Sequence, residues 1–169
     1  TTTVNLATAL AAVGKRVLVV DFDPQGNAST GLGIASDNRQ VTSYDIVISD
    51  LSLSDATKKT AVPNLEVVPA TIDLTGAEVE MVSLVNREFR LKNALERAGK
   101  QYDYVLIDCP PSLGLLTLNA LVAANAVLIP LQTEFYAMEG LSHLMRTIKL
   151  IQSGLNPELS IQGIVLTMY

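Results

Sequence analysis

Short apolar runs alternate along the chain with longer segments of helical periodicity. The runs are rich in Val, Ile and Leu and have the length of strands; they occupy Arg16–Asp23, Leu65–Ala70, Tyr104–Cys109, Ala126–Leu131 and Ile161–Met168. Several lack the polar alternation of a strand with one exposed face. They are therefore typical of strands that are covered on both faces, as in parallel sheets.

Helical patterns fill most of the intervals between these runs. Helices are predicted over Thr2–Val13, Arg87–Ala98, Ser112–Ala124 and Tyr136–Ser153. In the first of them, Leu6 and Leu10 share one face. Ala7 and Ala11 lie beside them and would let the helix approach a sheet closely. Gly14 comes next as a stop signal.

The repeated order of strand, helix and strand implies right-handed crossovers and a doubly wound α/β fold. Such a fold has a mostly parallel sheet with helices on both faces. The segment Ser36–Thr60 is more polar and is predicted to be a loop with a short helix around Tyr44–Ile48. Because no composition shift or repeat marks a boundary, we expect a single domain over residues 1–169. Both ends fall inside patterned segments, so we expect this domain to be truncated at both ends.

Composition narrows the functional classes. Of the 169 residues, 49% are apolar and 17% are charged, which is enough apolar material for a sizeable core. A net charge of −5 gives no basic footprint for nucleic acid. A single cysteine, Cys109, excludes an internal disulfide and favours a reducing, cytoplasmic compartment. No apolar run reaches the ~18 to 20 residues of a spanning helix, so no membrane association is expected.

Three carboxylates come after apolar runs at one predicted edge of the sheet. Asp21 and Asp23 end the first run, and Asp108 ends the central one. In open α/β sheets, ligands bind outside the carboxyl ends of the strands. An apolar strand that ends in Asp is typical of a Walker B element, where the carboxylate holds Mg²⁺. Each of these residues also fits a purely structural reading as a turn or capping residue.

The chain opens with Thr1-Thr2-Thr3 at the start of a predicted helix. Such a first turn is typical of the helix that begins at the Gly-Lys of a phosphate-binding loop, G-x-x-x-x-G-K-[ST], and the loop itself is missing from this sequence. The helix terminus would present N–H groups and a positive dipole end to phosphate. Taken alone, the threonines are read more simply as a helix N-cap.

Together these strings resemble the ParA/Soj family of chromosome- and plasmid-partitioning ATPases, a branch of the deviant Walker A P-loop ATPases. The most specific strings are DFDPQGN (Asp21–Asn27) and IDCPPSLGLLTLNAL (Ile107–Leu121), and the similarity covers nearly the whole chain. The resemblance implies a three-layer α/β/α fold like that of P-loop NTPases, with ATP and Mg²⁺ as cofactors. It also implies that the P-loop and a C-terminal part lie outside this chain.

The resemblance assigns roles to individual residues. Asp23 matches the residue that positions the attacking water, and Asp21 supports both catalysis and the Mg²⁺ shell. Asp108 matches the Walker B acid that binds the metal. The residues implied to contact the nucleotide are Thr1, Thr2, Gln25, Gly26, Asn27, Pro110, Pro111, Ser112, Met168 and Tyr169.

These nucleotide contacts form separate groups. Residues Gln25–Asn27 belong to the family's first switch segment. Residues Pro110–Ser112 belong to the second, which senses the γ-phosphate. Met168 and Tyr169 enter the segment that lies near adenine in relatives. The Mg²⁺-ligating Thr and both loop lysines of the family would precede residue 1.

The implied function is ATP hydrolysis by a dimerising switch in chromosome or plasmid partitioning. ATP would bridge two copies of the chain, and a ParB-type centromere-binding protein would stimulate hydrolysis. The dimer would bind DNA non-specifically through parts that are largely missing here, so the protein would be cytoplasmic and associated with the nucleoid. The acidic charge of the chain gives no independent support for DNA binding.

Two other interpretations stay open. A MinD-like positioning ATPase at the membrane surface would share the fold, although that branch has a different string where this chain has DPQGN. Alternatively, these residues taken literally are a non-catalytic module, because without the loop lysine their affinity for phosphate should be slight. A dehydrogenase is excluded because no G-x-G-x-x-G comes after the first strand. A nitrogenase-reductase-like role is excluded because the chain has one cysteine.

Overall fold

The computed structural model of the chain describes residues 1–132 and 137–168. Two compact units divide the chain, residues 1–120 and residues 121–169. The single domain over residues 1–169 and its truncation at both ends stay predictions.

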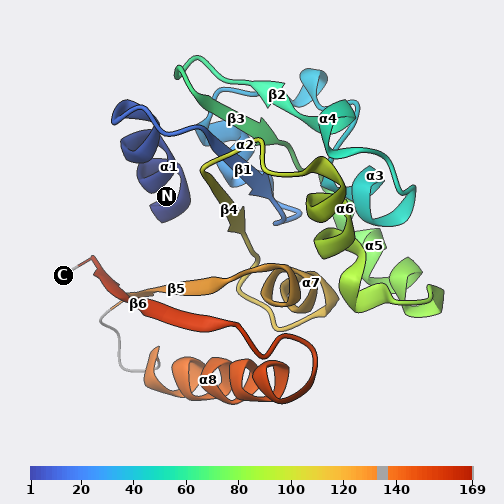
Figure 1. The fold of residues 1–169 in the computed structure, drawn as a ribbon, viewed down its shortest axis with the longest axis vertical. Coiled ribbons are helices and arrows are strands. Elements are labelled where there is room, and N and C mark those ends of the chain that lie inside the picture. The colour runs from blue at the N-terminus through green and yellow to red at the C-terminus, as the bar shows by residue number, and fades with distance from the viewer. Residues whose placement is uncertain (133–136, 169) are drawn as a thin grey trace. The chain divides into compact units, whose positions relative to one another are not determined.

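A four-stranded sheet forms the centre of the first unit (Figure 1). Its strands are β1 (Val17–Asp21), β2 (Lys58–Lys59), β3 (Leu65–Val68) and β4 (Tyr104–Asp108), in the order β2-β3-β1-β4. β1 pairs in parallel with both β3 and β4, and β2 pairs with β3 antiparallel at the edge. The mostly parallel α/β fold is thus confirmed. Every residue of β1 is buried, as its uninterrupted apolar pattern predicted.

One face of this sheet is covered by α1 (Thr2–Ala12) and α2 (Asn27–Gly31). Ala7 and Ala11 pack on Val17 and Val19 in one apolar cluster, so the alanine stripe does bring the helix close to the strand. Gly14 lies just past α1 with a φ of 83°, a conformation that glycine adopts without strain.

The opposite face carries helices that come from two separate stretches of the chain. Leu18 and Val20 point to this face because side chains alternate along a strand, and both are fully buried. The helices beside it in Figure 1 are α3 (Ser43–Ile48), α4 (Leu53–Ala56), α5 (Leu74–Glu80) and α6 (Arg90–Ala98). Short 3-10 turns occupy Ser36–Asn38, Met81–Ser83 and Arg87–Phe89. The predicted short helix around Tyr44–Ile48 is α3, while α4, α5 and β2 were not predicted.

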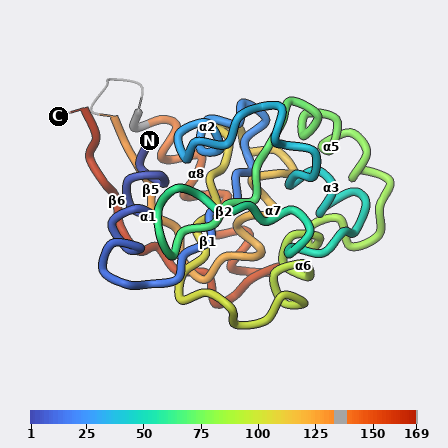
Figure 2. The backbone as a smooth tube through the Cα atoms, turned by 90° about the horizontal axis from the view of Figure 1, so that it is seen from above, coloured from blue at the N-terminus to red at the C-terminus, as the bar shows by residue number. Residues whose placement is uncertain are grey.

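The second unit contains a parallel pair of strands with a long helix alongside (Figure 1). Its elements are β5 (Ala126–Gln132), α8 (Ala137–Gly154) and β6 (Ser160–Thr167), and α7 (Leu115–Ala123) runs into it from the first unit. After α8 the chain turns back and places β6 beside β5, as the backbone trace in Figure 2 also shows. α7 begins three residues later than predicted.

One buried amide fastens the second unit together. Asn156 donates from Nδ2 to the backbone oxygens of Leu121, Val122 and Ala124, at 3.0, 3.2 and 2.7 Å. Leu121 and Val122 belong to the last turn of α7, whose carbonyls have no partner within the helix, and Ala124 comes directly after it. In the described part of the chain, no helix is both long enough and apolar enough to cross a membrane.

The packing of α1 on the sheet predicts the effect of a larger side chain. Ala7 has no exposed surface. Ala7→Leu should push α1 away from β1 and lower the free energy of unfolding by about 1 to 3 kcal/mol. Urea unfolding followed by circular dichroism measures this loss, with Ala9→Leu on the exposed side of the same helix as control. Equal stability of the two variants would contradict the packing of α1 against β1.

Candidate functional site

Two of the predicted carboxylates lie at the same edge of the sheet. Asp21 and Asp108 end the neighbouring parallel strands β1 and β4 and are register partners. Such strands run about 4.8 Å apart, so the two residues are immediate neighbours. The backbone N–H of Phe22 donates to the Asp108 carbonyl at 2.8 Å and continues the pairing past the strand end. The strands β1, β3 and β4 all end at this edge of the sheet, which we call the carboxyl edge.

Asp21 is shielded completely from solvent. Its Oδ2 accepts hydrogen bonds from the backbone N–H of Ser29 at 2.7 Å and from the Ser29 hydroxyl at 2.5 Å. Its Oδ1 accepts from the backbone N–H of Asp23 at 3.3 Å. A carboxylate without water needs such donors, and here the segment after β1 supplies all of those the structure shows.

Ser29 extends this arrangement to the neighbouring strand. Its Oγ donates to Asp21 and accepts from the backbone N–H of Ala70 at 3.1 Å. Ala70 lies just past the end of β3. One hydroxyl therefore connects the end of β1, the helix α2 and the end of β3.

The environment of Asp21 raises the pKa of its carboxyl above the ordinary value of 3.8. Burial is the largest cause, because it disfavours the charged form. The hydrogen bonds from Ser29 and Asp23 act in the opposite direction, and the charge of Asp108 raises the pKa further. The carboxyl edge thus concentrates negative charge.

The first turn of α1 meets this edge. The hydroxyl of Thr3 donates to Oδ1 of Asp108, which joins the start of the helix to the end of β4. Thr1 is exposed and forms the N-cap, and Thr2 is half-buried. The free N–H groups and positive dipole end of α1 are thereby placed next to the carboxylate, a geometry that suits phosphate.

The predicted first switch segment (Gln25–Asn27) forms a tight turn directly after β1. Oδ1 of the half-buried Asp23 accepts from the backbone N–H of Gln25, and the Asp23 carbonyl accepts from that of Gly26, both at 2.9 Å. Gly26 is buried and left-handed at φ 62°, and Asn27 opens α2. The turn holds Asp23 at the carboxyl edge beside Asp21.

The second switch segment (Pro110–Ser112) lies after β4 in a loop that ends at α7. The Ser112 carbonyl accepts from the Thr117 hydroxyl at 2.6 Å. Glu78 of α5 accepts from the backbone N–H of Leu116 at 3.4 Å, and a Cβ on Gly114 would collide with its carboxylate. Glu78 therefore packs against the turn that leads from this loop into the helix.

The other predicted nucleotide contacts do not belong to the first unit. Met168 comes after β6 in the second unit and is exposed, with a φ of 57°. Tyr169 lies outside the described residues.

Cys109 is next to Asp108, and burial together with the charges of Asp108 and Asp23 raises the pKa of its thiol to about 12. That thiol is protonated at neutral pH, which fits a filler and not a nucleophile.

The donor set fits a magnesium nucleotide. Within residues 1–132 and 137–168, no Lys or Arg forms an ion pair with Asp21, Asp23 or Asp108. No group of three acidic, His or Cys side chains in these ranges is placed to hold a metal unaided. Mg²⁺ commonly binds through one or two carboxylates together with substrate phosphates, so such a cage is not required.

Three contributing residues were not predicted as site residues. Thr3 was considered only as one of the threonines at the helix start. Among the described residues, it is the side chain that bonds the Asp108 carboxylate. Ser29 and Glu78 lie in segments without strong periodicity. Their contacts span 8 and 38 residues along the chain, and no local sequence pattern records such pairings.

Known proteins share this arrangement of elements. The family described as AAA domain matches residues 1–161. The sporulation initiation inhibitor protein Soj of Bacillus subtilis is 56% identical over 99% of this chain. The chromosome partitioning protein ParA of Caulobacter vibrioides is also 56% identical, over the whole chain. The chain belongs to the ParA/Soj family. It spans 66% and 64% of the length of these two relatives.

A solved structure agrees with this membership. The chain superimposes with a TM-score of 0.94 on a structure titled cobyrinic acid a,c-diamide synthase from Mycobacterium smegmatis, with bound ADP and magnesium. The two are 42% identical, and the match covers 99% of this chain and 69% of that one. The α/β fold of this ParA/Soj-family chain is therefore that of a protein crystallised with a magnesium nucleotide.

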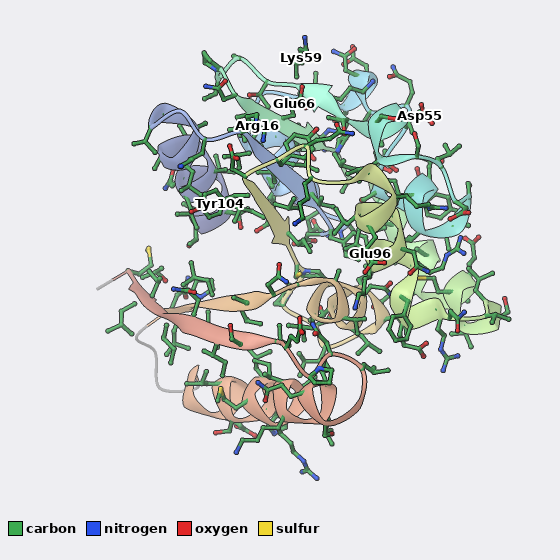
Figure 3. The ribbon with its side chains drawn as sticks, viewed as in Figure 1. Arg16, Asp55, Lys59, Glu66, Glu96 and Tyr104 are labelled. Atoms are coloured by element: carbon green, nitrogen blue, oxygen red, sulfur yellow. The ribbon has the colours of Figure 1, made fainter. Side chains whose placement is uncertain are left out.

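A cavity of about 470 Å³ lies elsewhere in this family member, toward the amino ends of β3 and β4. Figure 3 shows Lys59 and Glu66, partners on β2 and β3, at this side of the sheet. Glu66 accepts from the hydroxyl of Tyr102 at 2.6 Å. Burial, and after it this hydrogen bond, raises the pKa of Tyr102 to about 12. Asp50 and Arg97 of its lining form an ion pair at 2.8 Å. Because this arginine is already paired and the carboxyl-edge aspartates lie elsewhere, the cavity is not a candidate for the nucleotide.

The Asp21 network predicts a pH-dependent loss of stability in Ser29→Ala. The change removes a donor to the ionised carboxylate and leaves the Ala70 N–H without its acceptor, so at neutral pH the free energy of unfolding should fall by about 1 to 3 kcal/mol. Losing a bond to the charged form raises the pKa of Asp21 further. The loss should therefore be largest above that pKa and shrink as the pH falls through it.

Urea unfolding of the two proteins from acid to neutral pH tests this prediction. Ser36→Ala, a change of the same kind at an exposed position, is the matched control. A loss that is the same at every pH would contradict the bond between Ser29 and an ionised Asp21.

Proposed function

We propose that the complete protein is a Mg²⁺-dependent ATPase that acts as a switch in chromosome or plasmid partitioning. The observation that carries the proposal is the meeting of the α1 terminus with Asp108 through Thr3, at the edge where β1 delivers Asp21 and Asp23. This edge combines N–H donors for phosphate with oxygen donors for a cation. The names of the relatives, Soj and the chromosome partitioning protein ParA, support the biological setting.

The residues of this chain take distinct parts in the proposed site. The first turn of α1, with the hydroxyls of Thr1 and Thr2, binds phosphate oxygens. Asp108 holds the metal, and Thr3 fixes the direction of its carboxylate. Bound Mg²⁺ would neutralise negative charge on the phosphates.

Asp23 orients the attacking water in this proposal. Its half-buried carboxylate is fixed by the N–H of Gln25 and stays accessible from the carboxyl edge. Asp21 contributes from inside, because its hydrogen bonds to Ser29 and Asp23 hold the loop that presents Asp23. Catalysis of phosphoryl transfer rests on such positioning and on electrostatics.

Partners enter through the two switch segments. We propose that Gln25–Asn27 and Pro110–Ser112 contact the nucleotide and that ATP joins two copies of the protein. A ParB-type protein would stimulate hydrolysis, and the dimer would bind DNA non-specifically at the nucleoid. Because these residues carry a net charge of −5, the proposal places the DNA-binding surface largely outside them.

The role of Asp23 predicts separate effects on binding and turnover. In the complete protein, Asp23→Ala should keep the affinity for ATP within about threefold and lower turnover by at least about 100-fold. Titration with a fluorescent ATP analogue and a phosphate-release assay measure the two quantities. Asp37→Ala removes the same charge from an exposed turn and should change neither. Turnover that survives Asp23→Ala would refute the assigned role.

The contact between Thr3 and Asp108 predicts a change in metal dependence. Thr3→Val keeps the shape of the side chain and removes the donor, so the half-saturating Mg²⁺ concentration should rise about tenfold. Thr8→Val is the control, because Thr8 lies on the same helix and donates only to the Val4 carbonyl in the contacts described. Equal Mg²⁺ requirements in the two variants would show that Thr3 does not position the metal ligand.

A further inference from the structure

Arg39 connects three segments that converge behind the first switch. It comes directly after the 3-10 turn Ser36–Asn38, and its half-buried side chain runs back toward Gly26. Its guanidinium donates to four oxygens, at these distances in Å: Gly26 O (3.3), Ala70 O (3.1), Ile34 O (3.1 from Nε and 2.7 from Nη2) and Thr30 Oγ1 (2.8). These oxygens belong to the loop after β1, to α2 with the loop beyond it, and to the loop after β3.

All of these acceptors are neutral. Among the described residues, no carboxylate lies within ion-pair distance of Arg39. A planar guanidinium is suited to joining several segments because its donors point in several fixed directions at once. A lysine ammonium is a single point and cannot reach acceptors on three separated segments.

The segments that Arg39 joins are those that fix the carboxylates. The N–H of Gly26 donates to the Asp23 carbonyl at 2.9 Å, while the Gly26 carbonyl accepts from Arg39. The N–H of Ala70 donates to Ser29, which bonds Asp21, while the Ala70 carbonyl also accepts from Arg39. Gly26 and Ala70 thus each bond Arg39 through their carbonyl and the Asp21–Asp23 region through their N–H. We call Arg39 with its four acceptors the Arg39 clamp.

Gly26 shows how closely the clamp is packed. A Cβ on Gly26 would collide with Nη1 of Arg39 and would lie 2.9 Å from the Ala70 oxygen. The guanidinium therefore occupies the space directly against the turn that holds Asp23.

We propose that Arg39 is a positioning residue for hydrolysis, which holds Gly26 and Ala70 together so that Asp23 keeps its orientation toward the attacking water. The proposal rests on the proposed ATPase function. Arg39 acts through the turn and touches no reacting atom, so its loss should lower kcat and leave nucleotide binding largely intact.

The test uses the complete protein with Arg39→Ala and Arg39→Lys. Since a small misplacement of a catalytic group is costly, kcat for ATP should fall at least about tenfold in both, with KM within about threefold. Guanidinium chloride, at a concentration too low to unfold the protein, should restore part of kcat in Arg39→Ala only. Arg16→Ala is the matched control. Arg16 directly precedes β1, at the end away from Asp21 (Figure 3), and forms an exposed ion pair with Asp103.

Two outcomes would overturn the proposal: an unchanged kcat in Arg39→Ala, or a lowered kcat that guanidinium does not restore. Should Arg39→Ala fail to fold, Thr30→Val replaces it. This change keeps the arginine and removes a hydroxyl that accepts from Arg39 at 2.8 Å and donates to the Gly26 carbonyl at 3.0 Å. A drop in its kcat of at least about threefold supports the clamp, and an unchanged kcat contradicts it.

Amide hydrogen exchange separates this proposal from the proposed function. If the unaltered protein hydrolyses no ATP, the ATPase proposal fails, and the role of Arg39 in hydrolysis fails with it. Faster exchange over residues 23–34 in Arg39→Ala would still show that the clamp orders the loop. Unchanged exchange there would overturn the clamp even in an active ATPase.

Discussion

The need to satisfy a buried carboxylate governs the first unit. Asp21 ends the central strand without any contact with water, so its oxygens must receive hydrogen bonds from the protein. The chain supplies them by folding back after β1, and Ser29 reaches Asp21 with both its N–H and its hydroxyl. This return path places α2 on the sheet and leaves Asp23 in the turn between. The position of Asp23 is therefore a consequence of how Asp21 is satisfied.

The carboxylates of Asp21 and Asp108 differ in how many hydrogen bonds they already accept from the protein. Both oxygens of Asp21 already accept hydrogen bonds, one from Asp23 in the loop directly after it and the other from Ser29 in α2. Asp108 is half-buried, and the side-chain contact described for it comes from the hydroxyl of Thr3. In the proposed site Asp108 would thus keep lone pairs for a cation, and the charge of Asp21 would favour one. Their register on β1 and β4 makes this division of roles a property of the sheet.

The sequence predicts the strands and the carboxyl edge well because both depend on local patterns. The strands β1 and β4 are apolar up to their terminal Asp, β3 is interrupted by Glu66 alone, and parallel neighbours necessarily bring Asp21 and Asp108 to one edge. α2, with the sequence Asn-Ala-Ser-Thr-Gly, has no apolar periodicity, and β2 is a pair of lysines. Such elements form through contacts with distant residues, which a local pattern does not contain. Arg39 was part of a segment predicted only as a polar loop, because three of its four acceptors are backbone oxygens, which leave no mark on the sequence.

The two predicted switch segments share one kind of contact. In or just after each segment, a glycine contacts a long charged side chain from elsewhere in the unit. Gly26 contacts Arg39, and Gly114 contacts Glu78. A side chain of this kind can shift by rotating about several bonds, whereas the backbone bonds that anchor β1 and β4 cannot. The glycines remove the Cβ that would block such close contact. A loop fastened in this way is held in one arrangement through a single side chain. Under the proposed function, a movement of that side chain would release the loop in response to a bound nucleotide.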